Sequence, residues 1–214
     1  MNTPMVSCIM PTANRQKYIP FAVRYFLDQD YENAELIIID DGKETVQDII
    51  PDDPKIKYFY TKPLGTIGLK RNYACEKASG EIIMHWDDDD WHANDWISQQ
   101  VYHLTHSNAD ICGVEHVHFY SPITDTLWVG TALNRNNPTS SRNWLNGATL
   151  AYWKSFWAKH PFKDLQTRED DDFIANSNGK IYAHDYVDGI IVLLHPGNTT
   201  VKYFENEKHK INKL

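Results

Sequence analysis

The sequence has few cysteines and no long apolar run. Cys8, Cys75 and Cys112 are the only cysteines among 214 residues, and their spacing fits neither a disulfide framework nor a zinc site. No apolar stretch approaches the roughly 20 residues of a transmembrane helix. The first ten residues contain Pro4 and no basic residue, which is unlike a signal peptide. These absences predict a soluble protein without a membrane span, in the reducing cytoplasm.

Positive charge is also scarce. The chain carries 21 basic and 29 acidic side chains, which gives a net charge of −8. Such a surface repels a polyphosphate backbone, so nucleic acid is not an expected partner. The 42% hydrophobic and 13% aromatic content indicates an ordered globular domain rather than a disordered chain. An acidic protein that handles phosphate is expected to recruit a cation.

Apolar runs alternate with segments of helical periodicity in the first half. Strands are predicted at residues 6–10, 35–40, 56–60 and 81–86, and helices at residues 18–29, 45–50 and 69–78. Pro11 ends the first of these apolar runs. Strands that alternate with helices indicate an α/β fold, with a mostly parallel sheet covered by helices on both faces.

The second half has a mixed α+β pattern. A helix is predicted at residues 95–106, a strand at 110–120 that forms a hairpin with 124–129, a strand at 147–152, a helix at 169–177 and a last strand at 189–194. No repeat or linker divides the chain. We expect a single domain, with a nucleotide-binding half at about residues 1–92 and an acceptor-binding half at about 93–214. The lysine-rich tail, residues 202–214, is a solvated helix or the lead into a further C-terminal domain.

Polar residues follow the predicted strands. The first is followed by Thr12, the second by Asp41, the fourth by the aspartates of residues 87–90 and the last by His195. Ligands of an open parallel sheet bind beyond the carboxyl ends of its strands. Singly, an Asp-Gly turn, a helix cap at Thr12 or Asn14 and a structural histidine would explain them. Their joint placement favours one binding site.

Four adjacent aspartates, residues 87–90, give the sharpest signal. They repel one another, and a helix N-terminus would account for only one or two of them. Oxygen ligands on one short loop suit Mn²⁺ or Mg²⁺ shared with substrate phosphates, and the spacing does not fit a calcium EF-hand. The run therefore predicts a divalent metal site.

Several motifs, in this order, resemble a family 2 glycosyltransferase of the GT-A fold. They are Pro11-Thr12-Ala13-Asn14-Arg15, the strand ELIIIDDG, Lys70-Arg71-Asn72, the strand GEII, and Asp87-Asp88-Asp89, which resembles the DxD motif of that family. The resemblance covers nearly the whole chain. It implies a GT-A domain with a Rossmann-like central sheet and a smaller mixed C-terminal part.

The resemblance assigns donor-side roles. It implies that Pro11, Thr12 and Arg15 line the nucleotide pocket, that Asp41 hydrogen-bonds the uracil ring, that Asp87 and Asp88 face the nucleoside and ribose, and that Asp89 binds the metal. His195 begins a segment that resembles a stretch following the family's base, and it completes the metal shell or touches the diphosphate. Arg71 is a partner for the diphosphate or base. The alternative for Arg71 is a surface ion pair with Glu76 or Asp41.

The second acidic cluster, residues 169–172, resembles the ED motif that supplies the family's catalytic base. Asp170 matches the base, and Glu169, Trp144 and Asn146 are candidates for the acceptor side. A charged helix start would equally explain the cluster, and core packing would explain Trp144. One base with no second nucleophile implies inversion at the sugar carbon.

The function expected from these residues is metal-dependent, inverting transfer of a sugar from a UDP-sugar to a hydroxyl of a glycan or glycoprotein. One alternative is a nucleotidyltransferase that makes a sugar nucleotide, but residues 11–16 lack the glycines of a phosphate loop. The other is an inactive sugar-nucleotide binding module, which would be expected to lack the base at Asp170.

Overall fold

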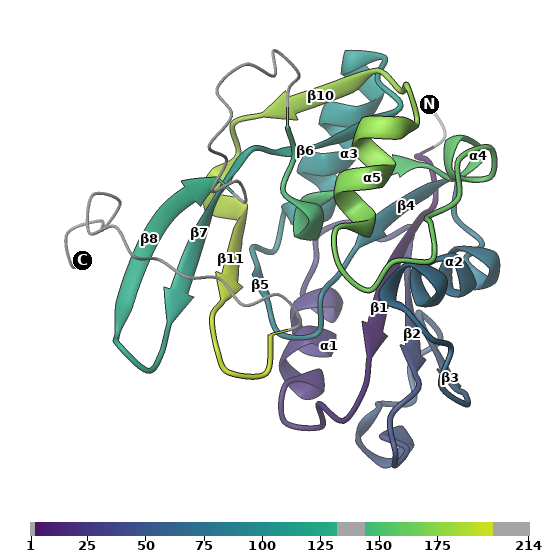
Figure 1. Ribbon diagram of the computed structural model, residues 1–214, viewed down its shortest axis with the longest axis vertical. Helices are drawn as coiled ribbons and strands as arrows, with labels where there is room; N and C mark the ends of the chain where they lie inside the picture. The colour runs from purple at the N-terminus through teal and green to yellow at the C-terminus, as the bar shows by residue number, and fades with distance from the viewer. Residues whose placement is uncertain (1–2, 132–143, 199–214) are drawn as a thin grey trace.

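The computed structural model describes residues 3–131 and 144–198, so the tail at residues 202–214 lies outside the described residues. The described chain forms one seven-stranded and one four-stranded sheet, with helices packed against the larger sheet (Figure 1). No helix in this part of the chain has the length and apolar character needed to cross a bilayer.

The seven-stranded sheet is mostly parallel. Its order is β10-β6-β9-β4-β1-β2-β3, and β9 runs antiparallel to both of its neighbours. Its strands are β1 (Val6–Thr12), β2 (Ala34–Asp40), β3 (Ile56–Tyr60), β4 (Ile82–His85), β6 (Ile111–Val114), β9 (Ala151–Trp153) and β10 (Ile181–His184). Strands β1, β2 and β4 are buried throughout because helices cover both faces, which explains their continuous apolar runs.

Helices divide between the two faces of this sheet (Figure 1). Helices α1 (Ile19–Leu27) and α3 (Trp96–Ser107) pack on one face. Helices α2 (Ile67–Lys77), α4 (Lys154–Trp157) and α5 (Glu169–Asn176) supply side chains to the core on the other. Each strand feeds both cores, since successive side chains point to opposite faces. The two cores fix α2 and α5 on the same side of the sheet.

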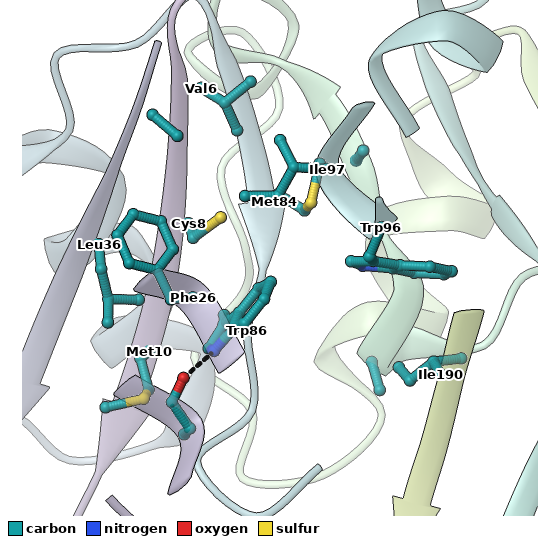
Figure 2. Close-up of a cluster of buried hydrophobic side chains, with 14 of the residues drawn as sticks. Val6, Cys8, Met10, Phe26, Leu36, Met84, Trp86, Trp96, Ile97 and Ile190 are labelled. Carbon is teal, nitrogen blue, oxygen red and sulfur yellow. Dashed lines mark hydrogen bonds between the residues drawn. The ribbon is translucent and has the colours of Figure 1, made fainter. Parts of the chain in front are cut away.

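Figure 2 shows the core beneath α1 and α3, where Trp86 directly follows β4. The Trp86 ring meets Phe26 edge to face at 5.9 Å between centroids. Its indole N–H donates to the carbonyl of Ala22, at 3.1 Å. This bond satisfies the buried polar atom and anchors α1 beside the start of the aspartate run.

The four-stranded sheet has the order β5-β11-β7-β8. It contains β5 (Trp91–His92), β7 (His116–Ser121), β8 (Thr126–Thr131) and β11 (Ile190–Leu193). The predicted hairpin is confirmed as the antiparallel pair β7 and β8. The last predicted strand is β11, which pairs with β5 and β7 rather than with the larger sheet. The interpretation of all four strand ends as ends of one sheet was therefore wrong for β11.

The α/β class and the mostly parallel sheet are confirmed, but two predicted strands were too long. The segment 110–120 divides at Glu115 into β6 and β7, which belong to different sheets. The segment 147–152 begins as the 3₁₀ turn Gly147–Thr149, because the Asn146 side chain accepts from the Ala148 amide. The short elements β5, α4 and β10 were not predicted, and the 3₁₀ turns Gln47–Ile49 and Val187–Gly189 complete the described elements.

Candidate active site

A cleft of about 750 Å³ opens at the carboxyl ends of β1 and β4. The first residues of α5 and the turn Gly147–Thr149 form its other side. The predicted site residues that line it are Pro11, Thr12, Arg15, Arg71, Asp87, Asp88, Asp89, Asn146, Glu169 and Asp170. The cleft is therefore built from both halves of the chain.

Asp88 lies at the buried base of the aspartate loop. The Thr12 hydroxyl donates to its carboxylate at 2.5 Å, and Arg15 contacts it at 2.9 Å. Burial raises the pKa of Asp88 to about 7, against the opposing charge of Arg15. Thr12 does not cap α1, whose N-cap, Tyr18, makes no side-chain capping bond. The helix-cap explanation of Thr12 was wrong.

Asp89 is the meeting point of the aspartate loop and the segment after β11. Its Oδ2 atom lies 2.8 Å from the Nε2 atom of His195 and accepts from the Asn198 side chain at 3.2 Å. Arg15 also forms an ion pair with it. Asp89 and His195 therefore lie together, although β11 belongs to the second sheet.

The donors at Asp89 suit a divalent ion shared with substrate. No group of three or more metal-binding side chains occurs among the residues that the structure describes. The Oδ2 atom of Asp89 is held by direct contacts with His195, Arg15 and Asn198. Mg²⁺ is held in proteins by one or two carboxylates plus substrate phosphates. The Asp89 carboxylate is of the ligand type that Mg²⁺ and Mn²⁺ prefer.

Asp41 does not line the cleft but is linked to it by Lys70. The Lys70 ammonium forms a short contact with the Asp41 carboxylate and donates to the carbonyl of Thr12 at 3.3 Å. The neighbouring Asp40, not Asp41, closes the Asp-Gly turn, because its Oδ1 atom accepts from the Gly42 amide at 2.9 Å. The Asp41 side chain therefore does not form this turn.

Arg71 lies buried between the two acidic clusters. Its Nε atom contacts Glu169 at 3.2 Å and its Nη2 atom contacts Asp87 at 3.4 Å. The alternative of a surface ion pair with Glu76 or Asp41 was wrong, since the side chain is only 5% exposed. Its Nη1 atom has no hydrogen-bond partner among the described residues. This N–H is available to an anionic ligand in the cleft.

Asp170 differs from its acidic neighbours because the nearby Arg71 acts on it at a distance rather than through an ion pair. In the first turn of α5, Glu169 pairs with Arg71, Asp171 with Arg168 and Asp172 with Lys163. No ion pair to Asp170 occurs among the described residues, and its Oδ1 atom accepts from the Asp171 amide at 2.8 Å. Burial, with the charges of Glu169 and Asp171, raises its pKa to about 6. The first turn of α5 is therefore a charged helix start, as the alternative explanation of the cluster held. It also contains one carboxylate, that of Asp170, which forms no ion pair among the described residues.

Gly147 makes room for that carboxylate. A Cβ atom at Gly147 would lie 1.6 Å from the Oδ2 atom of Asp170. The Gly147 carbonyl lies 2.6 Å from the Nδ1 atom of the buried His85. Burial lowers the pKa of His85 well below its usual value, so a neutral ring donates to this carbonyl. His85 is therefore a buried packing residue, and its hydrogen bond fixes the Gly147 turn beside Asp170.

The three residues predicted for the acceptor side, Glu169, Asn146 and Trp144, do not all line the cleft. Glu169 and Asn146 line the cleft, and the Asn146 Nδ2 atom has no partner among the described residues. Trp144 is 7% exposed, packs in the core beneath α2 and α5, and is not among the lining residues. The core-packing explanation of Trp144 therefore matches the structure.

Sequence reasoning missed several residues of the site. Lys70 and Asn72 stood in the motif that carried the family resemblance, but only the arginine between them received a role. Asn198 stood three residues after His195 and binds the same aspartate. Arg168 and Gln166 line the cleft, and nothing in their local pattern distinguishes them from surface residues.

The sheet, the cleft at its carboxyl edge and the aspartate loop define a protein of the GT-A fold class. The family model for glycosyl transferase family 2 matches residues 7–165. This chain belongs to that family.

Characterised and uncharacterised bacterial relatives match parts of the chain. An uncharacterised glycosyltransferase of Haemophilus influenzae is 38% identical over 127 residues, which cover 54% of this chain and 51% of that protein. The GalNAc(5)-diNAcBac-PP-undecaprenol beta-1,3-glucosyltransferase of Campylobacter jejuni is 38% identical over 94 residues, 41% of this chain and 30% of that one. The matched region thus spans about half or less of these relatives.

Solved structures share the fold at low sequence identity. TarS 1–349 of S. aureus in complex with UDP-GlcNAc has a TM-score of 0.69 at 18% identity, covering 93% of this chain and 61% of that one. The mannosyltransferase PcManGT of Pyrobaculum calidifontis, in complex with GDP-Man and Mn²⁺, has a TM-score of 0.68 at 17% identity, covering 91% and 57%.

Proposed function

We propose that this chain is the catalytic domain of a metal-dependent, inverting glycosyltransferase. It takes the sugar from a UDP-sugar and transfers it to a hydroxyl group of a glycan or glycoprotein. The observation that carries the proposal is a cleft that joins the aspartate loop and its basic partners to the carboxylate of Asp170, which forms no ion pair among the described residues. Family membership and the nucleotide-sugar complexes of TarS and PcManGT support this assignment.

The donor lies on the side of the aspartate loop. Asp87 and Asp88 face the nucleoside and ribose, Asp41 accepts from the uracil ring, and Pro11, Thr12, Arg15 and Arg71 surround the nucleotide. Asp89 and His195 would hold Mn²⁺ or Mg²⁺ together with the diphosphate. The ion, when bound, offsets the negative charge of the diphosphate leaving group. Arg15 and the free N–H of Arg71 supply further positive charge in a chain whose net charge is −8.

Asp170 acts on the acceptor side as the general base. Its carboxylate takes the proton of the acceptor hydroxyl, and the hydroxyl oxygen forms a bond to the anomeric carbon of the donor sugar. The bond from that carbon to the diphosphate breaks, and its electron pair leaves with UDP. Attack opposite the leaving group inverts the anomeric centre. A pKa raised to about 6 suits this role, since the group is ionised near neutrality and still basic.

Glu169 and Asn146 orient the acceptor from the two edges of the base. Glu169 is fixed by Arg71, whereas the Asn146 Nδ2 atom is free to donate to a sugar hydroxyl. Trp144 supports this wall from the core rather than from the cleft.

The test combines binding and stereochemistry. Titration calorimetry should show UDP binding with Mn²⁺ and its loss in EDTA. Incubation with UDP-sugars and a panel of oligosaccharide acceptors should release UDP, and NMR of the fresh product should show the anomer opposite to the donor. A retained anomer would exclude the single-base mechanism. Formation of sugar nucleotide from UTP and a sugar phosphate, or UDP binding without turnover on any acceptor, would overturn the proposal.

A further inference from the structure

We infer that helix α2 holds the segment that leads into Asp170 against the nucleotide site. We further infer that Asn72 is a positioning residue for Asp170. The inference rests on the proposed function, because it concerns where the base stands. It is carried by the contacts between α2 and residues 157–169, which lead into α5.

Asn72 holds Phe162 by both backbone groups. Its Nδ2 atom donates to the Phe162 carbonyl at 2.8 Å, and its Oδ1 atom accepts from the Phe162 amide at 2.9 Å. The same Oδ1 atom accepts from the indole N–H of Trp157, also at 2.9 Å. The side-chain amide thus pairs with this stretch as a neighbouring strand would. No other side chain has both this shape and this pair of donor and acceptor groups except glutamine, which is longer.

Phe162 carries this restraint to α5. Its ring packs on Phe173 with centroids 4.5 Å apart. Phe173 is 2% exposed and lies three residues after Asp170, on the same face of the helix. A shift of the Phe162 backbone would therefore move the helix turn that presents Asp170.

Three further contacts fasten the intervening residues to α2. The Thr66 hydroxyl donates to Asp164 at 2.8 Å, and the Gly68 amide donates to the Leu165 carbonyl at 3.1 Å. A Cβ atom at Gly68 would lie 2.1 Å from the Lys163 carbonyl oxygen, so the close approach requires glycine. Arg71 also pairs with Glu169, so contacts with α2 extend along this whole stretch.

The same helix also reaches the nucleotide side. Lys70 contacts Asp41 and the Thr12 carbonyl, and Arg71 contacts Asp87. Consecutive residues of α2 therefore touch the nucleotide loops and the segment that carries the base. A displacement of about 1 Å in a reacting group can cost about 10²-fold in rate. Loss of the Asn72 contacts should thus slow transfer without removing any group that touches the donor.

The charge surroundings of Asp170 provide a second readout. Glu169 and Asp171 lie on its own helix, Arg71 faces it from α2, and the Gly147 turn packed against it contributes no charge. Movement of α5 toward solvent would relieve the burial that raises the pKa of Asp170. The acidic limb of the rate profile should then shift to lower pH.

The experiment compares Asn72→Ala with two matched variants of the full chain. Trp157→Phe removes the indole N–H that binds Asn72, together with part of a ring packed in the core, and leaves Asn72 itself in place. Glu76→Gln changes an exposed residue one turn further along α2. Asn72→Ala should lower kcat about 10- to 100-fold, with donor KM and the UDP dissociation constant within about twofold of wild type. Trp157→Phe should lower kcat about two- to tenfold, as the loss of one hydrogen bond implies. Glu76→Gln should leave both unchanged.

The outcomes separate the two proposals. An unchanged kcat in Asn72→Ala, or equal losses of kcat and UDP affinity, would overturn the positioning role while leaving the proposed function intact. A shifted acidic limb supports it, whereas an unshifted limb with reduced kcat contradicts it. If Asn72→Ala does not fold, the positioning role is judged by Trp157→Phe instead. A reduced kcat with a shifted acidic limb then supports the role, and an unchanged kcat or an unshifted limb contradicts it. No transfer by wild type, or a near-normal rate in Asp170→Asn, would instead defeat the proposed function.

Discussion

The two acidic clusters look alike in sequence but are treated differently by the fold. In the loop of residues 87–90, Asp88 and Asp89 share Arg15, and His195 also meets Asp89. In the cluster at the start of α5, three of four carboxylates have a cation partner and Asp170 has none among the described residues. The first cluster is thus held by basic partners, whereas the second leaves one carboxylate without an ion pair.

In the proposed function, this difference in ion pairing separates the two acidic clusters. Arg15 favours the ionised form of Asp88, but burial outweighs it and raises the pKa of Asp88 to about 7. Asp170 has no ion pair among the described residues, and burial raises its pKa to about 6. A carboxylate that is not held in an ion pair is open to the proton of an acceptor hydroxyl, which a general base needs. Ion pairing, rather than proton affinity, therefore distinguishes the proposed donor side from the proposed acceptor side.

The largest expected effect tests the acceptor side. Asp170→Asn keeps the size of the side chain but removes its proton affinity, and kcat should fall about 10²- to 10⁴-fold. UDP affinity should stay near wild type. Asp172→Asn is the matched control, since Asp172 is paired with Lys163 and Asn176 and should tolerate the change. A slow Asp172 variant beside a normal Asp170 variant would reverse the assignment.

Asp89→Ala should break the donor side with the next largest effect. Removing one metal-side oxygen should weaken Mn²⁺-supported UDP binding by at least about tenfold, because even indirect partners of a metal contribute 10- to 100-fold to its affinity. Calorimetry with and without Mn²⁺ measures this loss. Asp48→Ala, at an exposed site in the 3₁₀ turn Gln47–Ile49, provides the control. Equal Mn²⁺ dependence in Asp89→Ala and wild type would remove Asp89 from the metal shell.

The pH dependence of kcat sharpens the comparison without a mutation. The pKa of Asp170 is raised to about 6, and only the deprotonated group accepts a proton. The contribution of Asp170 should therefore leave the rate flat above pH 7 and lower it about tenfold for each pH unit well below 6. Circular dichroism across the same range checks that the fold persists. A profile flat to pH 4.5 would mean that the base titrates in its ordinary range.

The same raised pKa has a consequence for stability. The folded state binds a proton at Asp170 more tightly than the unfolded chain does, so this contribution is present below the ordinary pKa of aspartate and lost as pH rises through about 6. Above that pH the ionised carboxylate opposes folding. Asp170→Asn should thus raise Tm at pH 7.5 while it lowers activity.

The smallest expected effect concerns the nucleoside. Asp41→Asn keeps an oxygen near Lys70 but removes the charge, and it should weaken UDP about two- to tenfold. Inorganic diphosphate should lose less, because the altered contact is to the base. Comparing the two ligands in one calorimetric series isolates this difference. Equal losses would show that Asp41 acts on the phosphates through Lys70.

Much of the fold was predictable because its strands are buried on both faces. Strands β1 and β2 are mostly apolar and buried along their whole length, as expected for a parallel sheet covered on both faces. The short strands β5 and β10 were not predictable, since two to four residues carry too little periodicity. The sheet to which β11 belongs depends on tertiary pairing that no local pattern records.

The candidate site was predictable where chemistry was concentrated in sequence. The run of four aspartates and the position of Asp170 stand out because like charges crowd together. The partners that give them different behaviour come from far along the chain, as with Arg71 and Glu169, 98 residues apart. The role of Trp144 was not predictable in this way, because its apolar ring suits a sugar face and a core equally well. In the structure it packs in the core.

The three cysteines, which excluded a disulfide framework at the outset, give the molecule internal reporters. Cys8 and Cys112 lie in the core beneath α1 and α3, and Cys75 lies on α2 in the opposite core. Burial raises the pKa of all three thiols, that of Cys75 to about 12. A thiol reagent therefore modifies each one only when its layer opens. The labelling rate of Cys75 measures how often the core beneath α2 opens. The labelling rates of Cys8 and Cys112 measure the opening of the core beneath α1 and α3 in the same sample.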